Sequence, residues 1–244
     1  MNIWDKCSTI DPVTTDNRIV FNSLDLEAEI DISQRNLPHW FQVGAATFVT
    51  FRTADSIPKS VLLRWQRELV EWLKLRNLPC DLADSIFSPS ETDRARLLDL
   101  LGIRHYREFK RLSDRIFHQS LDECHGVCLL RAPSVAKIVA EAVLHYVDEK
   151  YNLDNFIVMP NHVHAIVQFR VGANLDTVSQ SWMRYSARRI NQLLKREGHV
   201  WQAEPFDHII RSPEQFHYLH NYIADNPQKA NLPSSDYHYW SRPL

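Results

Sequence analysis

Glycine is scarce in this chain of 244 residues, with only five, and no G-x-G-x-x-G or Walker pattern is present. Loops that wrap a nucleotide phosphate need glycine where the backbone approaches the ligand. The sequence therefore excludes the common nucleotide-cofactor enzymes.

Long apolar runs are absent as well. No segment approaches the ~18 consecutive apolar residues of a membrane span, and residues 1–16 lack the apolar core of a secretory signal. The four cysteines are then expected to be reduced thiols in a cytoplasmic protein that does not contact a membrane.

Two of these cysteines form the pattern Cys124-His125-x-x-Cys128, which has the spacing of a zinc-binding loop. A structural zinc site uses four ligands, and no second Cys/His pair of matching spacing lies nearby. A zinc site and a loop of reduced thiols both stay open, and the ligand count favours the thiol loop.

The net charge of −2 conceals an asymmetry. Residues 1–36 contain seven acidic and three basic residues, a net charge of −4, so the rest of the chain carries +2. This weak basic bias is compatible with a nucleic-acid partner, and the acidic segment is expected to be a mobile or loosely docked leader.

Alternating and helical hydrophobic patterns predict a mixed architecture. Strands are expected at 45–52, 153–159, 162–169 and 206–211. Helices are expected from Asp55 or Ser56 to about Arg76, and at 92–119, 134–149, 173–196 and 212–225, the last stopped by Pro227. This order predicts an α+β fold with helices packed on a small, mainly antiparallel sheet.

His162 and His164 are two residues apart on an expected strand, so their side chains share one face, about 7 Å apart along the chain. Two imidazoles in this arrangement can bind one divalent metal ion. The alternative is a pair of strand-edge histidines that bond to solvent or backbone.

Tyr222 and Asn226 are four residues apart on the last expected helix and share one face. The Asn226 carbonyl oxygen suits a hard cation, and a phenol next to a cation is a competent nucleophile. The alternative is that Tyr222 belongs to the core and that Asn226 ends the helix before Pro227.

The helix expected at 173–196 carries Arg184, Arg188 and Lys195 near one side, a pattern that suits phosphate contacts or a solvated surface. Trp201, Phe206 and His208 are candidate stacking surfaces for unpaired bases.

Together these motifs resemble a known family. The segment Val158-Met159-Pro160-Asn161-His162-Val163-His164 is similar to the signature of HUH single-tyrosine transposases. Later matches follow in order: Asn191, 198–202, Phe206-Asp207, Ile210-Arg211 and 222–230. The segments 37–40, 48–52 and 125–131 look like the subgroup of REP-associated tyrosine transposases.

The resemblance spans about residues 37–232. It implies a ferredoxin-like sheet of the HUH endonuclease type. The segments that it does not explain are expected to be a leader at 1–36, a helical insertion at about 77–120 and a tail at 233–244. It implies a metal-dependent endonuclease and strand transferase that uses Mg²⁺ or Mn²⁺ and acts on single-stranded DNA, often as a foldback hairpin from a repeat. A homodimer is compatible with it.

The resemblance also implies residue roles. Tyr222 matches the nucleophile that forms a 5′-phosphotyrosine intermediate, with Tyr218 as the fallback one turn earlier. His162, His164 and Asn226 match the metal ligands, and Arg184, Arg188, Lys195 and Arg211 are the candidate DNA contacts. Residues 1–36 and 77–120 match no motif, and Asn231 stands where the family usually has glycine. A DNA-binding regulator that does not cut and a metal-dependent hydrolase of small phosphoesters are the competing functions.

Overall fold

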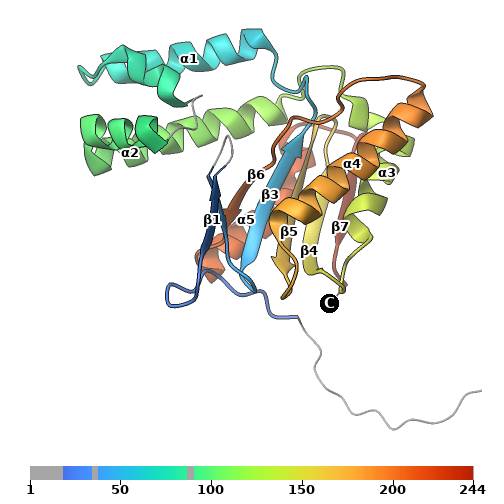
Figure 1. Ribbon diagram of the computed structural model, residues 1–244. Helices are drawn as coiled ribbons and strands as arrows, with labels where there is room; N and C mark the ends of the chain where they lie inside the picture. Colours follow the sequence, from blue (N-terminus) through green and yellow to red (C-terminus); the bar gives the residue numbers. More distant parts are fainter. Residues whose placement is uncertain (1–18, 35–37, 87–90, 244) are drawn as a thin grey trace, which may run out of the picture.

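The computed structural model describes residues 19–34, 38–86 and 91–243. Helices pack on both faces of a central antiparallel sheet, and a helical pair projects from its edge (Figure 1). The strands are β1 (Asp31–Gln34), β2 (Pro38–Phe41), β3 (Ala46–Arg52), β4 (Tyr151–Val158), β5 (His162–Phe169), β6 (Phe206–Ile209) and β7 (His238–Ser241). The helices are α1 (Lys59–Lys74), η1 (Cys80–Ile86), α2 (Glu91–Asp122), η2 (Leu129–Arg131), α3 (Pro133–Leu144), α4 (Leu175–Leu194) and α5 (Pro213–Lys229).

The main sheet has the strand order β6-β3-β5-β4-β7, and every neighbouring pair is antiparallel. The chain runs from β3 through helices to the β4–β5 hairpin, then through α4 to β6. This connectivity with the order β6-β3-β5-β4 is the split βαβ arrangement of ferredoxin-like folds. The expected fold class is therefore confirmed, with additional helices between β3 and α3.

The two faces of the sheet bury different cores because side chains alternate along each strand. Val163, Ala165 and Val167 of β5 pack with α3 and α4 in the larger core. Ile166, on the opposite face, packs with α5. His162 and His164 have the parity of Ile166 and therefore face α5 as well.

The α1–α2 pair has a core of its own, built on Leu69, Leu73 and Phe109, which packs separately from the sheet. Within α2 the helix is interrupted at Gly102, where φ is 64° and ψ is 163°. This backbone region is essentially restricted to glycine. The last turn of α2 returns to the sheet and places Asp122 beside β5.

Two segments outside the expected domain core contact the sheet. Residues 238–241, in the segment expected as a tail, form β7 and pair with β4. Within the expected leader, Leu24 N–H donates to the Ile210 carbonyl at 2.7 Å and Phe21 stacks on Phe216. Residues 1–18 and 35–36 of that leader lie outside the described residues.

Several helix ends differ from the prediction. Helix α1 begins at Lys59 with Pro58 as its N-cap, so neither Asp55 nor Ser56 caps it, and the Ser56 hydroxyl donates to the Thr53 carbonyl instead. Helix α5 continues to Lys229 with Pro227 inside its last turn, where Ala230 N–H still bonds the Asn226 carbonyl. Proline near a C-terminus removes one hydrogen bond without blocking the turn. Helix α3 ends at Leu144, about one turn early, because the chain turns through Asp148 at φ 66° to begin β4. No helix in the described ranges is long and apolar enough to cross a bilayer.

Candidate metal centre and nucleophile

The two histidines lie side by side under α5. Strand β5 places both on one face, with ring centroids 4.6 Å apart and both side chains fully buried. Burial lowers the pKa of His162 to about 3 and that of His164 well below its ordinary value, the neighbouring imidazoles adding to the effect. Both rings are therefore neutral at pH 7, the form that donates a lone pair to a metal ion.

Each imidazole uses its Nδ1 atom for a partner within the protein. His162 Nδ1 lies 2.8 Å from Asn161 Oδ1, and the Asn161 amide is oriented because its Nδ2 donates to the His125 carbonyl at 3.0 Å. Since Asn161 Oδ1 only accepts, His162 Nδ1 donates and its Nε2 carries the lone pair. His164 Nδ1 lies 2.7 Å from Thr50 Oγ1 on β3, its cross-strand neighbour.

A carboxylate completes the cluster. One ligand atom each of Asp122, His162 and His164 lie within 4.8 Å of one another. Within the described ranges this is the one group of at least three His, Cys, Asp or Glu side chains close enough to share an ion. Asp122 comes from the end of α2, two residues beyond the expected insertion.

Helix α5 brings Tyr222 and Asn226 to the same place. The Tyr222 ring lies 5.4 Å from His164 and 5.9 Å from His118, and Asn226 is fully buried. Asp122 lies close enough to Tyr222 and Asn226 for both to influence its pKa. The sequence-predicted quartet of His162, His164, Tyr222 and Asn226 therefore assembles at one point.

Several polar atoms at this point are buried without a hydrogen bond of normal geometry. They are Nε2 of His162 and His164, Oδ1 of Asp122, the Tyr222 hydroxyl and both amide atoms of Asn226. Each such group costs roughly 1–3 kcal/mol when left unsatisfied, so their convergence calls for a ligand. Two imidazole nitrogens with carboxylate and amide oxygens fit a divalent cation such as Mn²⁺ or Mg²⁺.

Burial also affects the protonation of the Asp122 carboxyl and the Tyr222 phenol. Burial raises the pKa of Asp122 to about 6, against the opposing influence of Asn226 and Lys229. Burial and then the Asp122 charge raise the pKa of Tyr222, so its phenol is protonated at neutral pH. The Lys229 ammonium lies 4.8 Å from the centre of the Tyr222 ring.

The structure does not bring the expected DNA contacts to this point. Arg184, Arg188 and Lys195 are exposed, but α4 covers the opposite face of the sheet. Arg211 follows β6 at the Ala46 end of β3, whereas His162 pairs with Arg52 at the other end. Their DNA contact stays a prediction.

The remaining candidates are placed as follows. Tyr218 is 67% exposed and stacks on Tyr222 one turn away from the histidines. Of the three expected base-stacking surfaces, Trp201 is buried and its Nε1 donates to Ser186 at 2.9 Å. Phe206 and His208 are partly buried on β6, with ring centroids 6.0 Å apart. Cys124 and Cys128 are free, and Cys128 Sγ donates to the Cys124 carbonyl at 2.7 Å, as a reduced-thiol loop would.

Sequence reasoning missed Asp122, Thr50 and His118. Asp122 and His118 occupy a helix with no matched motif, about 40 residues before the histidines. Thr50 was inside an expected strand, but its role depends on the register between β3 and β5. The segment carrying Asn161 was recognised, although the hydrogen bond of Asn161 to His162 was not expected.

Neither a protein-family model nor a curated protein matches the chain. A solved structure described as a REP-associated tyrosine transposase bound to a REP hairpin is similar over 78% of this chain and 71% of that chain. The identity is 11% and the TM-score 0.41. That description names the kind of protein that the sequence motifs resemble.

Proposed function

We propose that this protein is a metal-dependent single-stranded DNA endonuclease and strand transferase of the HUH single-tyrosine kind, related to REP-associated tyrosine transposases. Tyr222 is the nucleophile, and His162 and His164 are metal ligands with Asp122 and Asn226 as the oxygen donors. Hairpin-forming repeat DNA is the substrate implied by the motif resemblance.

One observation supports this proposal above the rest. A phenol hydroxyl without a hydrogen bond of normal geometry lies beside His164, which with His162 forms a pair of neutral imidazoles whose Nε2 atoms are also unsatisfied. A hydrolase would need no tyrosine there, and a protein that only binds DNA would need neither the tyrosine nor the imidazole pair. Because these atoms are buried, a phosphate can reach them only if side chains around the centre move.

The chemistry is a transesterification. The Tyr222 oxygen forms a bond to phosphorus while the bond from phosphorus to the 3′ oxygen breaks. This leaves a 5′-phosphotyrosine and a 3′-hydroxyl. The phenol proton passes to Asp122 or to water, and the leaving oxygen takes a proton from water. A bound divalent ion would polarise the phosphate and favour the phenolate. Attack by another 3′-hydroxyl reverses the step and joins new ends.

An adduct assay tests the nucleophile. Wild-type protein and Tyr222→Phe are incubated with labelled single-stranded hairpin DNA from the sequence flanking the gene, with Mn²⁺, Mg²⁺ or EDTA, and are run on a denaturing gel. We expect a metal-dependent protein–DNA adduct with the wild type and none with Tyr222→Phe. Tyr218→Phe is the matched control and should retain the adduct.

Other outcomes separate the competing functions. An adduct that persists in Tyr222→Phe and disappears in Tyr218→Phe would move the nucleophile to Tyr218. Hairpin binding without an adduct in any metal would favour a regulator that does not cut. Phosphoester hydrolysis unaffected by Tyr222→Phe would favour a hydrolase.

Mn²⁺ binding, which needs no DNA, tests whether Asp122 and Asn226 are oxygen ligands of the metal ion. Loss of a ligand carboxylate in Asp122→Asn should weaken Mn²⁺ binding by about tenfold or more in calorimetry, since loss of a group that only orients a ligand already costs about 10–100-fold. Asp114→Asn, on the same helix but paired with Lys110, is the control. Unchanged binding in Asp122→Asn together with a loss in Asn226→Ala would leave Asn226 as the oxygen ligand.

A further inference from the structure

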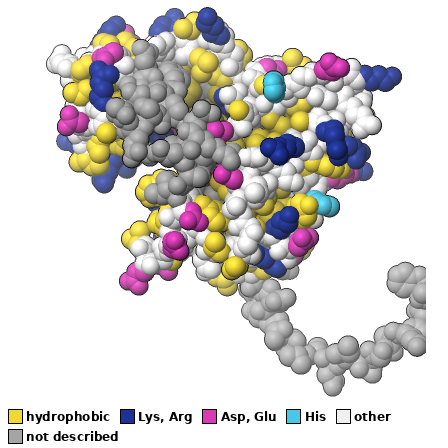
Figure 2. All heavy atoms as spheres, in the orientation of Figure 1, with side chains coloured by type: hydrophobic (Ala, Val, Ile, Leu, Met, Phe, Trp, Pro, Cys, Tyr) yellow, Lys and Arg dark blue, Asp and Glu magenta, His cyan; other side chains and the backbone are white. Residues whose placement is uncertain are grey.

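Helix α2 carries a row of basic residues that no motif singled out. Arg107, Arg111 and Arg115 are exposed and spaced four residues apart, so they follow one line along the helix. We name this row the α2 arginine stripe. Figure 2 shows Lys and Arg side chains over the projection that α1 and α2 form.

The stripe points along the helix toward the candidate centre. At 3.6 residues per turn, its arginines fall within an arc of about 80° that also contains His118 and Asp122. His118 contacts the Tyr222 and His164 rings, and Asp122 belongs to the ligand cluster. The distance along the axis from Arg107 to Asp122 is about 22 Å, enough to follow several nucleotides of a single strand.

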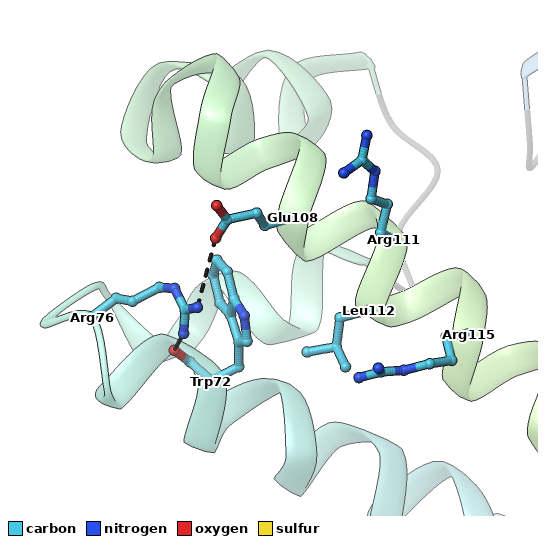
Figure 3. A pocket seen from close by; sticks show the side chains of 6 residues that line it. All are labelled: Trp72, Arg76, Glu108, Arg111, Leu112 and Arg115. Carbon is cyan, nitrogen blue, oxygen red and sulfur yellow. Dashed lines mark hydrogen bonds and ion pairs between the residues drawn. The ribbon is translucent and has the colours of Figure 1, made fainter.

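A pocket lies beside the α2 arginine stripe. The pocket has a volume of about 350 Å³ and lies between α1 and α2, lined by Trp72, Arg76, Glu108, Arg111, Leu112 and Arg115 (Figure 3). The Arg115 guanidinium extends beside Leu112 toward Trp72, and Arg111 points away from that ring. Arg76 lies over the Trp72 ring, with its guanidinium carbon 3.9 Å from the ring centre.

The acidic neighbours do not neutralise the stripe. Glu108 pairs with Arg76 and Arg104, at 3.6 and 3.3 Å, and Asp114 pairs with Lys110 at 3.1 Å. Among the residues that the structure describes, no acid forms an ion pair with Arg107, Arg111 or Arg115. Three exposed guanidinium groups without an ion-pair partner in the described part of the chain are suited to an anionic polymer.

We infer that the α2 arginine stripe and its pocket bind the phosphate backbone of the single-stranded DNA next to the scissile phosphate. This inference rests on the proposed function, because the stripe is aligned with the candidate centre, where that phosphate reacts. The helical insertion then has two roles, since it supplies Asp122 to the site and guides the strand toward it.

Equilibrium binding tests the inference without requiring cleavage. Tyr222→Phe protein in EDTA is titrated into a fluorescein-labelled thymidine oligonucleotide of about 20 nucleotides at several salt concentrations. Adding Arg111→Ala and Arg115→Ala should weaken binding about tenfold near 0.1 M salt. It should also reduce the slope of log affinity against log salt by about 1.4, since each phosphate contact on a single strand contributes about 0.7.

Matched variants control for net charge and folding. Lys137→Ala with Arg170→Ala removes the same charge away from α2 and should change binding little. Arg111→Lys with Arg115→Lys keeps the charges and should retain most of the affinity. Alanine suits exposed helix positions, so folding should be preserved, as circular dichroism would verify.

Two results would overturn the inference: an unchanged slope in the double alanine variant, or an equal loss in the Lys137/Arg170 control. Either result leaves the adduct assay, and with it the proposed function, untouched. Conversely, stripe-dependent binding with no adduct in any metal would reject the cutting function and retain the DNA-binding surface.

Discussion

The hydroxyl of Thr50 fixes the orientation of His164. It lies 2.7 Å from His164 Nδ1, on the strand next to β5, and both groups are buried. A partner on Nδ1 holds the ring in one orientation and leaves Nε2 available as the ligand atom. Thr50 is therefore a positioning residue rather than a ligand.

Replacing Thr50 tests this role. Thr50→Val keeps the shape but removes the hydroxyl, so Mn²⁺ binding measured by calorimetry should weaken by about tenfold. Thr50→Ser retains a hydroxyl and should restore most of the affinity. If valine and serine variants bind Mn²⁺ equally well, the hydrogen bond does not organise the site.

The loop between α2 and η2 links the end of the helical insertion to β5. Its His125 carbonyl accepts from Asn161, the partner of His162, and Val127 N–H donates to Asp55 at 2.8 Å. Gly126 has φ +88°, and a Cβ there would lie 2.6 Å from the Asp55 carbonyl oxygen. The loop therefore requires glycine both for its backbone angle and for its close approach to Asp55.

A pair of glycine substitutions separates these two requirements. Gly172 has a similar φ of +84° but open space around it. Gly172→Ala should cost about 1 kcal/mol of unfolding free energy from backbone strain alone, and Gly126→Ala about 3 kcal/mol in urea denaturation. Equal losses would mean that the loop moves away from Asp55 without cost.

At the scale of the whole molecule, the enclosed site makes stability depend on pH. Burial lowers the pKa of His208 to about 4, below the ordinary 6.5, and lowers that of His118 as well. Below pH 6.5 these histidines bind protons in the unfolded chain but stay neutral in the folded chain. They therefore destabilise the fold as the pH falls. Asp122 acts in the opposite sense, because its pKa is raised to about 6.

The variant His208→Gln isolates one of these contributions. Without metal, the wild type should lose about 2 kcal/mol more unfolding free energy between pH 7 and pH 5 than the variant, since each pKa unit corresponds to about 1.4 kcal/mol. Urea denaturation in EDTA at the two pH values measures the difference. Parallel losses in both proteins would contradict the buried, neutral state of His208.

Local periodicity predicted the direction of the candidate site side chains, whereas their assignment to one site came from the motif resemblance. Alternation along β5 places His162 and His164 on one face, and the helical repeat places Tyr222 and Asn226 on one face, whatever surrounds them. The bounds of β5 matched the prediction, and those of β3 differed by one residue, since both are dense in strand-forming residues.

Only the tertiary structure decided which groups meet. Asp122 joins the histidines because α2 returns to the sheet after the Gly102 interruption, and Thr50 meets His164 because of the β3–β5 register. The basic residues of α4 are on the opposite face, because the apolar side of α4 packs with α3. Sequence spacing fixes the direction of a side chain within its own element, whereas packing between distant elements depends on the complementary surfaces that the whole chain buries together.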